Sequence, residues 1–283
     1  MTTRPRTPKL PPVFRGTLQA GEHHLEFGDV TYVMGVINLS PESKNAHTVA
    51  TTPGEARSLA DRYRQWGADL VEVGGQSSHY DNPTIEADEE TKRVVPAVEA
   101  LVADGHIVVV DTWKPEVAHA AIEAGAAVIN DTGGFRSAEM RRVVAPTDAA
   151  VIAVYVEGDD PHAVDEVSIG PHKTRSVVDA FGRLLEDVGP SLRSRVLLDP
   201  GIAINYRGDY RAYTRFQLEV IRQSSLFAPL ERPLVIPIPR KADIHWVSAY
   251  ITLALEYGAD MIRVHDVAVA ARLVRLWERE VDS

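Results

Sequence analysis

The sequence contains no cysteine, so disulfide bonds and thiol catalysis are both excluded. It has no apolar run long enough to span a membrane, and its first residues, MTTRPRTPKLPPVF, lack the apolar centre of a signal peptide. From these absences we expect a cytoplasmic protein without a membrane partner.

An excess of positive charge is also missing. The chain has 30 Lys and Arg residues against 40 Asp and Glu residues, which gives a formal net charge of −10. Because no basic run offers a track for phosphates, we expect no nucleic-acid partner. A small anionic ligand is still compatible with this charge, provided that a few cations gather at one site.

The sequence does contain eight short apolar runs that alternate with segments of helical pattern. Such alternation is typical of parallel strands joined by crossover helices, and 283 residues suit one (β/α)8 TIM barrel of the α/β class. An open, doubly wound sheet is the alternative, since periodicity alone does not prove closure. Most runs lead into a polar residue, in chain order Asn38, Gln76, Asp111, Asn130, Tyr155, Asp199, Lys241 and Arg263.

The rest of the chain fits one domain over residues 15–283, preceded by a flexible tail at 1–14 that is rich in Pro, Arg and Thr. Residues 15–29 are predicted to form a short hairpin that covers one barrel end. Helices are predicted over 54–66, 86–103, 115–124, 137–145, 173–187, 208–224, 243–257 and 266–280, and the long polar loops are 39–52, 76–85 and 156–171.

Two carboxylates and an amide, Asp111, Asn130 and Asp199, would share one mouth of such a barrel. A carboxylate accepts two parallel N–H bonds from a guanidine-like edge, and an asparagine both donates and accepts. The set therefore suits a flat heterocycle with an amino-pyrimidinone edge. The alternative for each residue by itself is the capping of the following helix.

Three potential cations, Lys241, Arg263 and His265, follow the last two predicted strands, where this fold often holds phosphate. Together they suit a diphosphate. The alternative is structural: Arg263 could pair with Asp260 or Asp266, and His265 could be a core histidine. Asn38, at the end of the first predicted barrel strand, could bind a phosphate oxygen or Mg²⁺.

In this order, these residues resemble dihydropteroate synthases. The family is a TIM barrel that joins 6-hydroxymethyl-7,8-dihydropterin diphosphate to p-aminobenzoate in folate biosynthesis and releases pyrophosphate. The matching stretches are Met34–Pro41, Gly67–Asp69, Gly74–Ser78, Val110–Thr112, Ile129–Asp131, Leu198–Gly201, Arg240-Lys241 and Arg263–Val267, and they span nearly the whole chain.

The resemblance implies roles for the polar residues. Asp111, Asn130, Asp199 and Lys241 would hold the pterin, while Asn38, Arg263 and His265 would hold the diphosphate, with Mg²⁺ as cofactor at Asn38. Lys241, Arg263 and His265 would be the catalytic residues. The resemblance also implies an arylamine as second substrate and a homodimer.

The sequence departs from the family around the second substrate. The family's first loop usually reads Pro-Asp-Ser-Phe-Ser-Asp-Gly, and its second Ser-Thr-Arg-Pro-Gly. Here they read Pro41-Glu42-Ser43-Lys44-Asn45-Ala46-His47 and Ser77-Ser78-His79-Tyr80-Asp81, and Ala242 replaces a serine that helps to hold the p-aminobenzoate carboxylate. Two further functions therefore stay open: a pterin-binding paralogue without synthase activity, and a methyl-tetrahydrofolate corrinoid methyltransferase. The latter needs no diphosphate clamp, so the retained Arg263 and His265 count against it.

We expect weak or undetectable turnover with p-aminobenzoate, because several contacts to its carboxylate are replaced. Each lost hydrogen bond to a charged group costs about 1.5–3 kcal/mol, or about ten- to a hundredfold in affinity. Lys44 and His47 are the cations that could replace these contacts. A steady-state assay of dihydropteroate formation tests this. A Michaelis constant in the low micromolar range with ordinary turnover would show that the altered loops compensate.

Overall fold

A computed structural model describes residues 12–77, 79, 81–158, 160–164, 173–206, 208–239 and 243–281. Eight parallel strands form its central sheet, and each coincides with one of the predicted apolar runs. They are β3 (Tyr32–Asn38), β4 (Leu70–Gly74), β5 (Ile107–Asp111), β6 (Val128–Asp131), β7 (Ala150–Val154), β8 (Val196–Asp199), β9 (Val235–Pro237) and β10 (Met261–Val264).

The sheet closes into a barrel. Its hydrogen-bonded order runs β8-β7-β6-β5-β4-β3-β10-β9, so β8 and β9 are the two ends. A parallel bridge between Leu198 and Leu234 joins these ends, and the N–H of Leu198 donates to the carbonyl of Pro233 at 2.9 Å. The predicted (β/α)8 barrel is therefore confirmed, and the open, doubly wound sheet is wrong for this chain.

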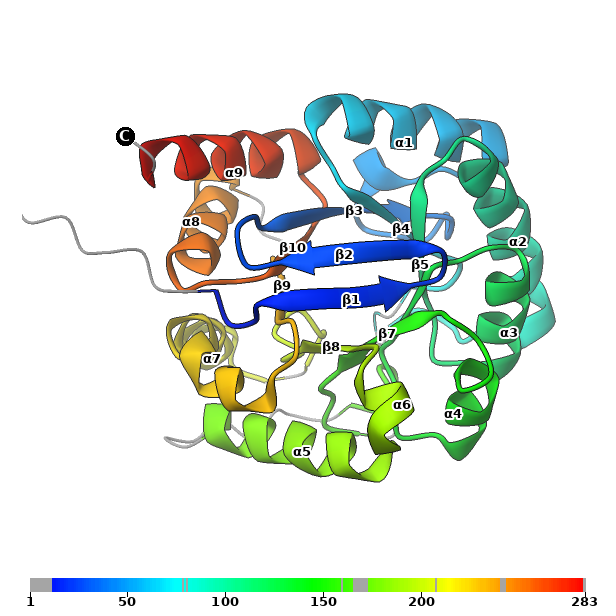
Figure 1. Cartoon of the computed structure of the whole chain (residues 1–283). Coiled ribbons are helices and arrows are strands. Elements are labelled where there is room, and N and C mark those ends of the chain that lie inside the picture. Colours follow the sequence, from blue (N-terminus) through cyan, green and yellow to red (C-terminus); the bar gives the residue numbers. More distant parts are fainter. Residues whose placement is uncertain are drawn as a thin grey trace, which may run out of the picture.

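Helices surround the barrel, as Figure 1 shows. Eight of them lie within two residues of the predicted bounds, and the short α6 and the 3-10 helices η1 and η2 were not predicted. The helices are α1 (Pro53–Trp66), α2 (Ala87–Ala103), α3 (Pro115–Glu123), α4 (Ala138–Val144), α5 (Lys173–Asp187), α6 (Gly189–Arg193), α7 (Tyr210–Arg222), α8 (Ile244–Glu256), α9 (Val267–Val281), η1 (Ala46–Thr48) and η2 (Ser224–Leu230).

Local chemistry explains why α1 begins and ends where the pattern predicts. Thr52 accepts a hydrogen bond from the backbone of Glu55, whose side chain in turn accepts from the backbone of Thr52, and Pro53 occupies the first turn. The helix ends at Gly67 with φ of 108°, a conformation that glycine adopts without a steric cost.

The N-terminal hairpin closes the end of the barrel where the strands begin. Strands β1 (Gly16–Ala20) and β2 (His23–Phe27) pair antiparallel and cross this end in Figure 1. Leu18 and Leu25 point inward and pack in one cluster with residues at the strand starts, such as Leu70 and Met261. The predicted plug is therefore present, and the substrate-binding end must be the opposite one.

The predicted tail, residues 1–14, lies mostly outside the described residues. Its last two residues belong to the barrel structurally. The N–H of Val13 donates to the carbonyl of Gly258, and the N–H of Phe14 donates to the Asp260 carboxylate at 3.2 Å. The N-terminal segment thus contacts the barrel from Val13 onward, two residues before the predicted start of the domain at residue 15.

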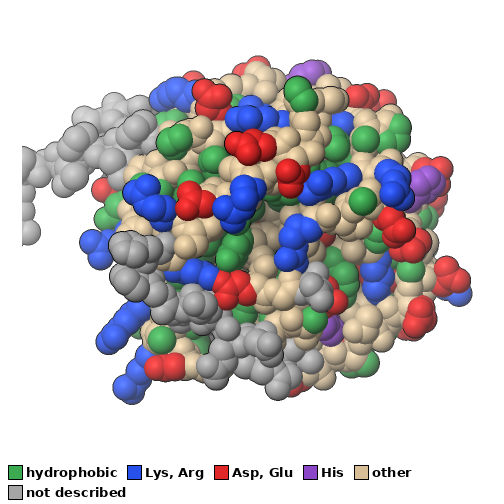
Figure 2. Space-filling view, turned by 90° about the horizontal axis from the view of Figure 1, so that it is seen from below, with side chains coloured by type: hydrophobic (Ala, Val, Ile, Leu, Met, Phe, Trp, Pro, Cys, Tyr) green, Lys and Arg blue, Asp and Glu red, His purple; other side chains and the backbone are tan. Residues whose placement is uncertain are grey.

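The surface carries both signs of charge. Figure 2, which views the molecule from the side of α5 in Figure 1, shows Lys and Arg side chains interspersed with Asp and Glu on that face. Among the helices that the structure describes, none is both long and apolar enough to cross a membrane.

Loss of a buried side chain from the N-terminal hairpin should destabilise the fold. Leu18 is 1% exposed, so we expect Leu18→Ala to lower the free energy of unfolding by about 2–5 kcal/mol through lost burial and a residual cavity. Leu276→Ala is the matched control, because Leu276 is 46% exposed and should cost far less. Urea unfolding measures both, and equal effects would contradict the assignment of the hairpin to the core.

Candidate functional site

Strand alternation places the polar residues inside the barrel. In β4, Leu70 packs with the hairpin inside the barrel, whereas Val71 and Val73 pack with the helices. Every second residue shares a face, so Glu72 points inward like Leu70. The same period puts Asp111 above Val109, and the other inward pairs are Val128 with Asn130, Leu197 with Asp199 and Met261 with Arg263.

Two adjoining cavities open at the carboxyl ends of the strands. The smaller, about 30 Å³, is lined by Asp111, Asn130, Asp199 and Arg263. The larger, about 240 Å³, adds Asn38, Glu72 and His265 from the strands and residues of the first and second loops. The structure thus brings together the predicted acid-amide-acid set and three of the predicted diphosphate residues. Lys241 lies outside the described residues.

Glu72 is a site residue that the sequence reading missed. Its side chain accepts from Nε of Arg263 at 2.8 Å and 3.0 Å, and from Nη2 of the same guanidinium. Nδ2 of Asn130 donates to Glu72 Oε2 at 3.0 Å. The available signal was a lone carboxylate inside the apolar run Leu70–Val73, at an inward position of the period-two pattern.

The alternative from the sequence, that Arg263 pairs with Asp260 or Asp266, is therefore wrong. Its partners are Glu72 and, through Nη2, Asp111 Oδ2 at 3.2 Å. Asp260 accepts from the backbone of Phe14 and Leu234 instead. The interior position of Arg263 explains this, because only inward-facing carboxylates can reach its guanidinium.

The two carboxylates share one guanidinium, which leaves buried negative charge in excess. Burial and the negative charge of Glu72 raise the pKa of Asp111 well above its ordinary value. Burial opposes the charge of Arg263, but Glu72 and Asp111 together hold the pKa of its guanidinium above the ordinary value. The cluster therefore stays assembled around a cation while Asp111 takes up a proton easily.

A tight turn after β8 holds the side chain of Asp199 in place. The N–H of Gly201 donates to Asp199 Oδ1 at 2.7 Å, and burial raises the pKa of this carboxyl to about 7. Gly201 has φ of +70°, and an added Cβ would lie 1.9 Å from the carbonyl oxygen of Tyr155, so glycine is required there. Oδ1 thus holds the turn, and Asp199 still lines the smaller cavity.

Helix capping does not account for Asp111 or Asn130. The side chain of Ser137 caps α4, and the residue before α3 is Lys114, whose side chain makes no cap. Asn130 is 1% exposed and donates to Glu72, while Asp111 contacts Arg263 and accepts from Thr132 at 3.4 Å. Both side chains thus belong to the barrel interior.

The orientation of the Asn38 amide follows from its neighbour. Thr48 uses its hydroxyl proton to donate to the carbonyl of Asn45 at 2.9 Å, so its oxygen accepts from Asn38 Nδ2 at 2.6 Å. The carbonyl oxygen Oδ1 of Asn38 is thereby left as the amide's acceptor atom at the cavity. Within the part of the chain that the structure describes, no group of three or more His, Asp or Glu side chains could hold a metal by itself.

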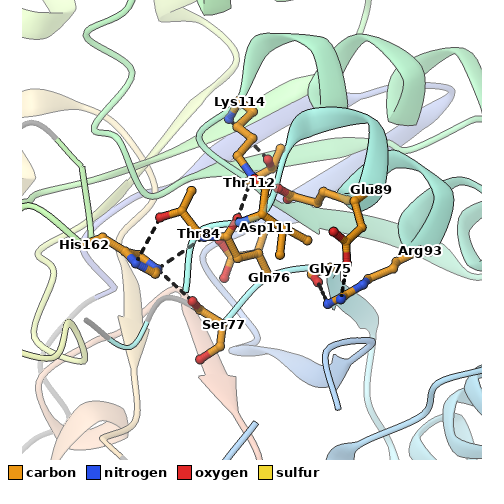
Figure 3. A network of polar contacts seen from close by, with 12 residues as sticks. Gly75, Gln76, Ser77, Thr84, Glu89, Arg93, Asp111, Thr112, Lys114 and His162 are labelled. Atoms are coloured by element: carbon orange, nitrogen blue, oxygen red, sulfur yellow. Dashed lines mark hydrogen bonds and ion pairs between the residues drawn. The ribbon is translucent and has the colours of Figure 1, made fainter. Parts of the chain in front are cut away.

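Side-chain contacts anchor the second loop, and Figure 3 shows Gln76 and Ser77 of this loop beside Lys114 and His162. Lys114 Nζ donates to Gln76 Oε1 at 2.5 Å, to the Ile85 carbonyl at 2.6 Å and to the buried carboxylate of Glu90 at 2.7 Å. A ring nitrogen of His162, from the loop after β7, lies 2.9 Å from the carbonyl of Ser77. The backbone of the second loop is therefore tied to two other loops.

Known proteins of one family match this chain. A family described as pterin binding enzymes matches residues 34–265. A dihydropteroate synthase of Bacillus subtilis is 28% identical over 90% of each chain. A probable bifunctional folylpolyglutamate synthase/dihydropteroate synthase of Haloferax volcanii is 30% identical over 92% of this chain, which spans about a third (32%) of that relative's length.

Solved structures agree with the sequence relatives. The dihydropteroate synthase of Burkholderia cenocepacia, complexed with 7,8-dihydropteroate, has a TM-score of 0.78 at 27% identity, covering 96% of this chain and 97% of that one. The enzyme of Xanthomonas albilineans, with 4-aminobenzoic acid, has a TM-score of 0.78 at 26% identity, covering 93% and 97%.

Loss of the guanidinium should destabilise the barrel itself. We expect Arg263→Ala to lower the free energy of unfolding by about 3–5 kcal/mol, because Glu72 would stay buried without a counter-charge. Adding Glu72→Gln to this variant should restore part of the loss by removing that charge. Urea denaturation of the three proteins measures it. A change below about 1 kcal/mol in the single variant would show that the pair is not structural.

Proposed function

This chain belongs to the family of pterin-binding enzymes, and we propose that it is a transferase of the dihydropteroate synthase type. It would condense 6-hydroxymethyl-7,8-dihydropterin diphosphate with an arylamine, p-aminobenzoate or a relative, and release pyrophosphate. The observation that carries this proposal is the placement of Asp111, Asn130 and Asp199 around one interior cavity that adjoins a larger one.

The proposed pterin position follows from hydrogen-bond chemistry. Asp199 would accept the two N–H groups of the amino-pyrimidinone edge, and Asn130 and Asp111 would complete the polar rim. Asp111, Arg263, Ala203 and Ile204 line both cavities, so a pterin ring would lie across the two. Lys241 remains a predicted pterin residue.

The diphosphate would lie at the mouth, near Asn38, Arg263 and His265. Arg263 uses Nε and Nη2 for Glu72 and Asp111, and Nη1 has no hydrogen bond to the described residues. His265 Nε2 lies 3.2 Å from Asn45 Nδ2, which orients the ring toward the first loop. These groups would stabilise negative charge that develops on the leaving pyrophosphate, so they would act mainly in the transition state.

We propose Mg²⁺ as the cofactor. The residues fit it as a partial site: the oriented Oδ1 of Asn38 offers one hard oxygen ligand, and Mg²⁺ commonly takes its other ligands from water and phosphate. When bound, the ion would neutralise part of the diphosphate charge. The chain's own contribution is to orient the amide through Thr48 and to place it at the cavity that would hold the diphosphate.

In the proposed reaction, the bond between the exocyclic methylene carbon and the diphosphate oxygen breaks, and that carbon bonds to the amine nitrogen. The amine then releases one proton. The electron-rich dihydropterin stabilises the developing cation, and the buried carboxylates around it favour positive charge. A homodimeric assembly and a cytoplasmic location remain predictions.

A two-step experiment tests the function against its alternatives. Calorimetry with pterin diphosphate asks whether the ligand binds, and an assay of pyrophosphate release with and without p-aminobenzoate asks whether it reacts. Binding with amine-dependent release supports the transferase. Binding without release under any amine would favour a paralogue without synthase activity, and methyl transfer from methyl-tetrahydrofolate to a corrinoid would favour the methyltransferase.

We expect the affinity for a dihydropterin to rise with pH. The ionised form of Asp199 accepts the ligand's N–H groups, and its pKa of about 7 means that protonation competes below that pH. Binding should therefore be about tenfold weaker at pH 6 than at pH 8. Asp199→Asn should cost about 1.5–3 kcal/mol and flatten this dependence. Calorimetry at several pH values measures both. An unchanged dissociation constant in the folded variant would contradict the assignment.

A further inference from the structure

The second loop, residues 76–85, is closed at its base. The backbone N–H of Ile85 donates to Oε1 of Gln76 at 3.2 Å, which joins the last residue of the loop to the side chain of the first. We call these two residues the neck of the loop. Between them the loop carries Ser77 and His79, which line the larger cavity. The neck therefore sets where these cavity-lining residues stand.

One ammonium group contacts both residues of the neck. It belongs to Lys114, in the turn between β5 and α3, and its Nζ donates to Gln76 Oε1 at 2.5 Å and to the Ile85 carbonyl at 2.6 Å. Its third contact is with the Glu90 carboxylate of α2 at 2.7 Å. An ammonium has three protons and no acceptor, so these contacts use its full donor capacity. Lys114 stands outside the described linings of both cavities, so it can influence a ligand only through the loop.

Stability alone does not account for the pair of Lys114 and Glu90. Glu90 is 0% exposed, and its Oε1 has no hydrogen bond to the described residues. Withdrawing two charges from water costs free energy that a buried apolar pair of similar size would avoid. An apolar pair, however, supplies no directional donor. The ammonium supplies one to each residue of the neck, and the carboxylate holds that ammonium in place.

We propose that Lys114 is a positioning residue of the site: its ammonium keeps the neck of the second loop closed and so fixes the cavity wall that Ser77 and His79 form. This assignment rests on the proposed function and deepens it, because it gives a residue outside the cavity control over one of its walls. The residues proposed to hold the pterin lie on barrel strands. Loss of the ammonium should therefore affect the step that involves the loop wall and spare binding of the pterin.

The test uses the double variant Lys114→Met/Glu90→Gln. Methionine and glutamine nearly keep the two side-chain shapes, and both charges leave together, so no buried charge stays without a partner. Hydrogen–deuterium exchange is followed by mass spectrometry of peptides. We expect exchange within residues 76–85 to become about tenfold faster or more, because the neck loses its charged donor. Exchange in strands β5 and β6 should change less than about twofold.

Arg57→Met is the matched control. Nε of Arg57 donates to the carboxylate of Asp104 at 2.5 Å, just past the other end of α2. This variant also removes a cation from a carboxylate next to α2, but away from the neck. It should leave exchange in the second loop unchanged.

Ligand measurements should divide in the same way. In the double variant, the dissociation constant of 6-hydroxymethyl-7,8-dihydropterin, measured by calorimetry, should change less than about twofold. In the assay of pyrophosphate release at saturating pterin diphosphate, kcat/KM for 4-aminobenzoate should fall about tenfold or more. A lysine that only stabilised the fold would not separate the two ligands.

Three results would overturn the role of Lys114. One is unchanged exchange in the second loop of the double variant. Another is a rise of equal size in the loop and in strands β5 and β6, which would show a loss of overall stability. The third is faster loop exchange with kcat/KM for 4-aminobenzoate unchanged, because the neck would then not control the cavity wall.

Exchange also separates this proposal from the proposed function. If the wild type releases no pyrophosphate with any amine, the transferase proposal fails, and exchange decides the role of Lys114 by itself. Faster exchange confined to residues 76–85 would support it. Unchanged exchange there would overturn it.

Discussion

The site depends on a buried ion pair between Glu72 and Arg263. The two residues are 191 positions apart in the chain, yet the carboxylate accepts from two nitrogens of the guanidinium. Their strands, β4 and β10, flank β3 in the closed sheet, and Asn130 and Asp111 extend the contact to β6 and β5. Removing charges from water is costly, so such a pair persists only with satisfied hydrogen bonds. The polar interior is therefore one unit, and its members cannot be exchanged singly.

This unit has a chemical consequence. One guanidinium faces two carboxylates, and a third, Asp199, lies buried nearby in the same small cavity. Burial raises the pKa values of Asp111 and Asp199, and the excess negative charge contributed by Glu72 adds to the rise for Asp111. A ligand that brings N–H donors, or a cationic transition state, relieves this excess. The arrangement thus favours the same kind of ligand that the family relationship suggests.

The scaffold and the loops differ in what they constrain. The residues proposed to hold the pterin lie on strands whose register the barrel holds, as the pairing of Asp111 with Asn130 shows. The first and second loops are held by side-chain contacts, from Lys44 to His79 and from Gln76 to Lys114. A change of loop residues can therefore alter the second substrate without disturbing the barrel. This separation agrees with a sequence that keeps the first set and departs from the family in the second.

The sequence by itself determined the eight strands, most helix bounds, the hairpin and the shared mouth of Asp111, Asn130 and Asp199, because period, capping and turn chemistry are local properties of the chain. Glu72 was not predicted as a site residue, because it is a single carboxylate inside an otherwise apolar run. Only the tertiary structure decided that Arg263 meets Glu72 rather than Asp260 or Asp266, and that Lys44 meets His79. Those pairings depend on which strands and loops become neighbours once the barrel closes, and no local pattern encodes a partner 191 positions away.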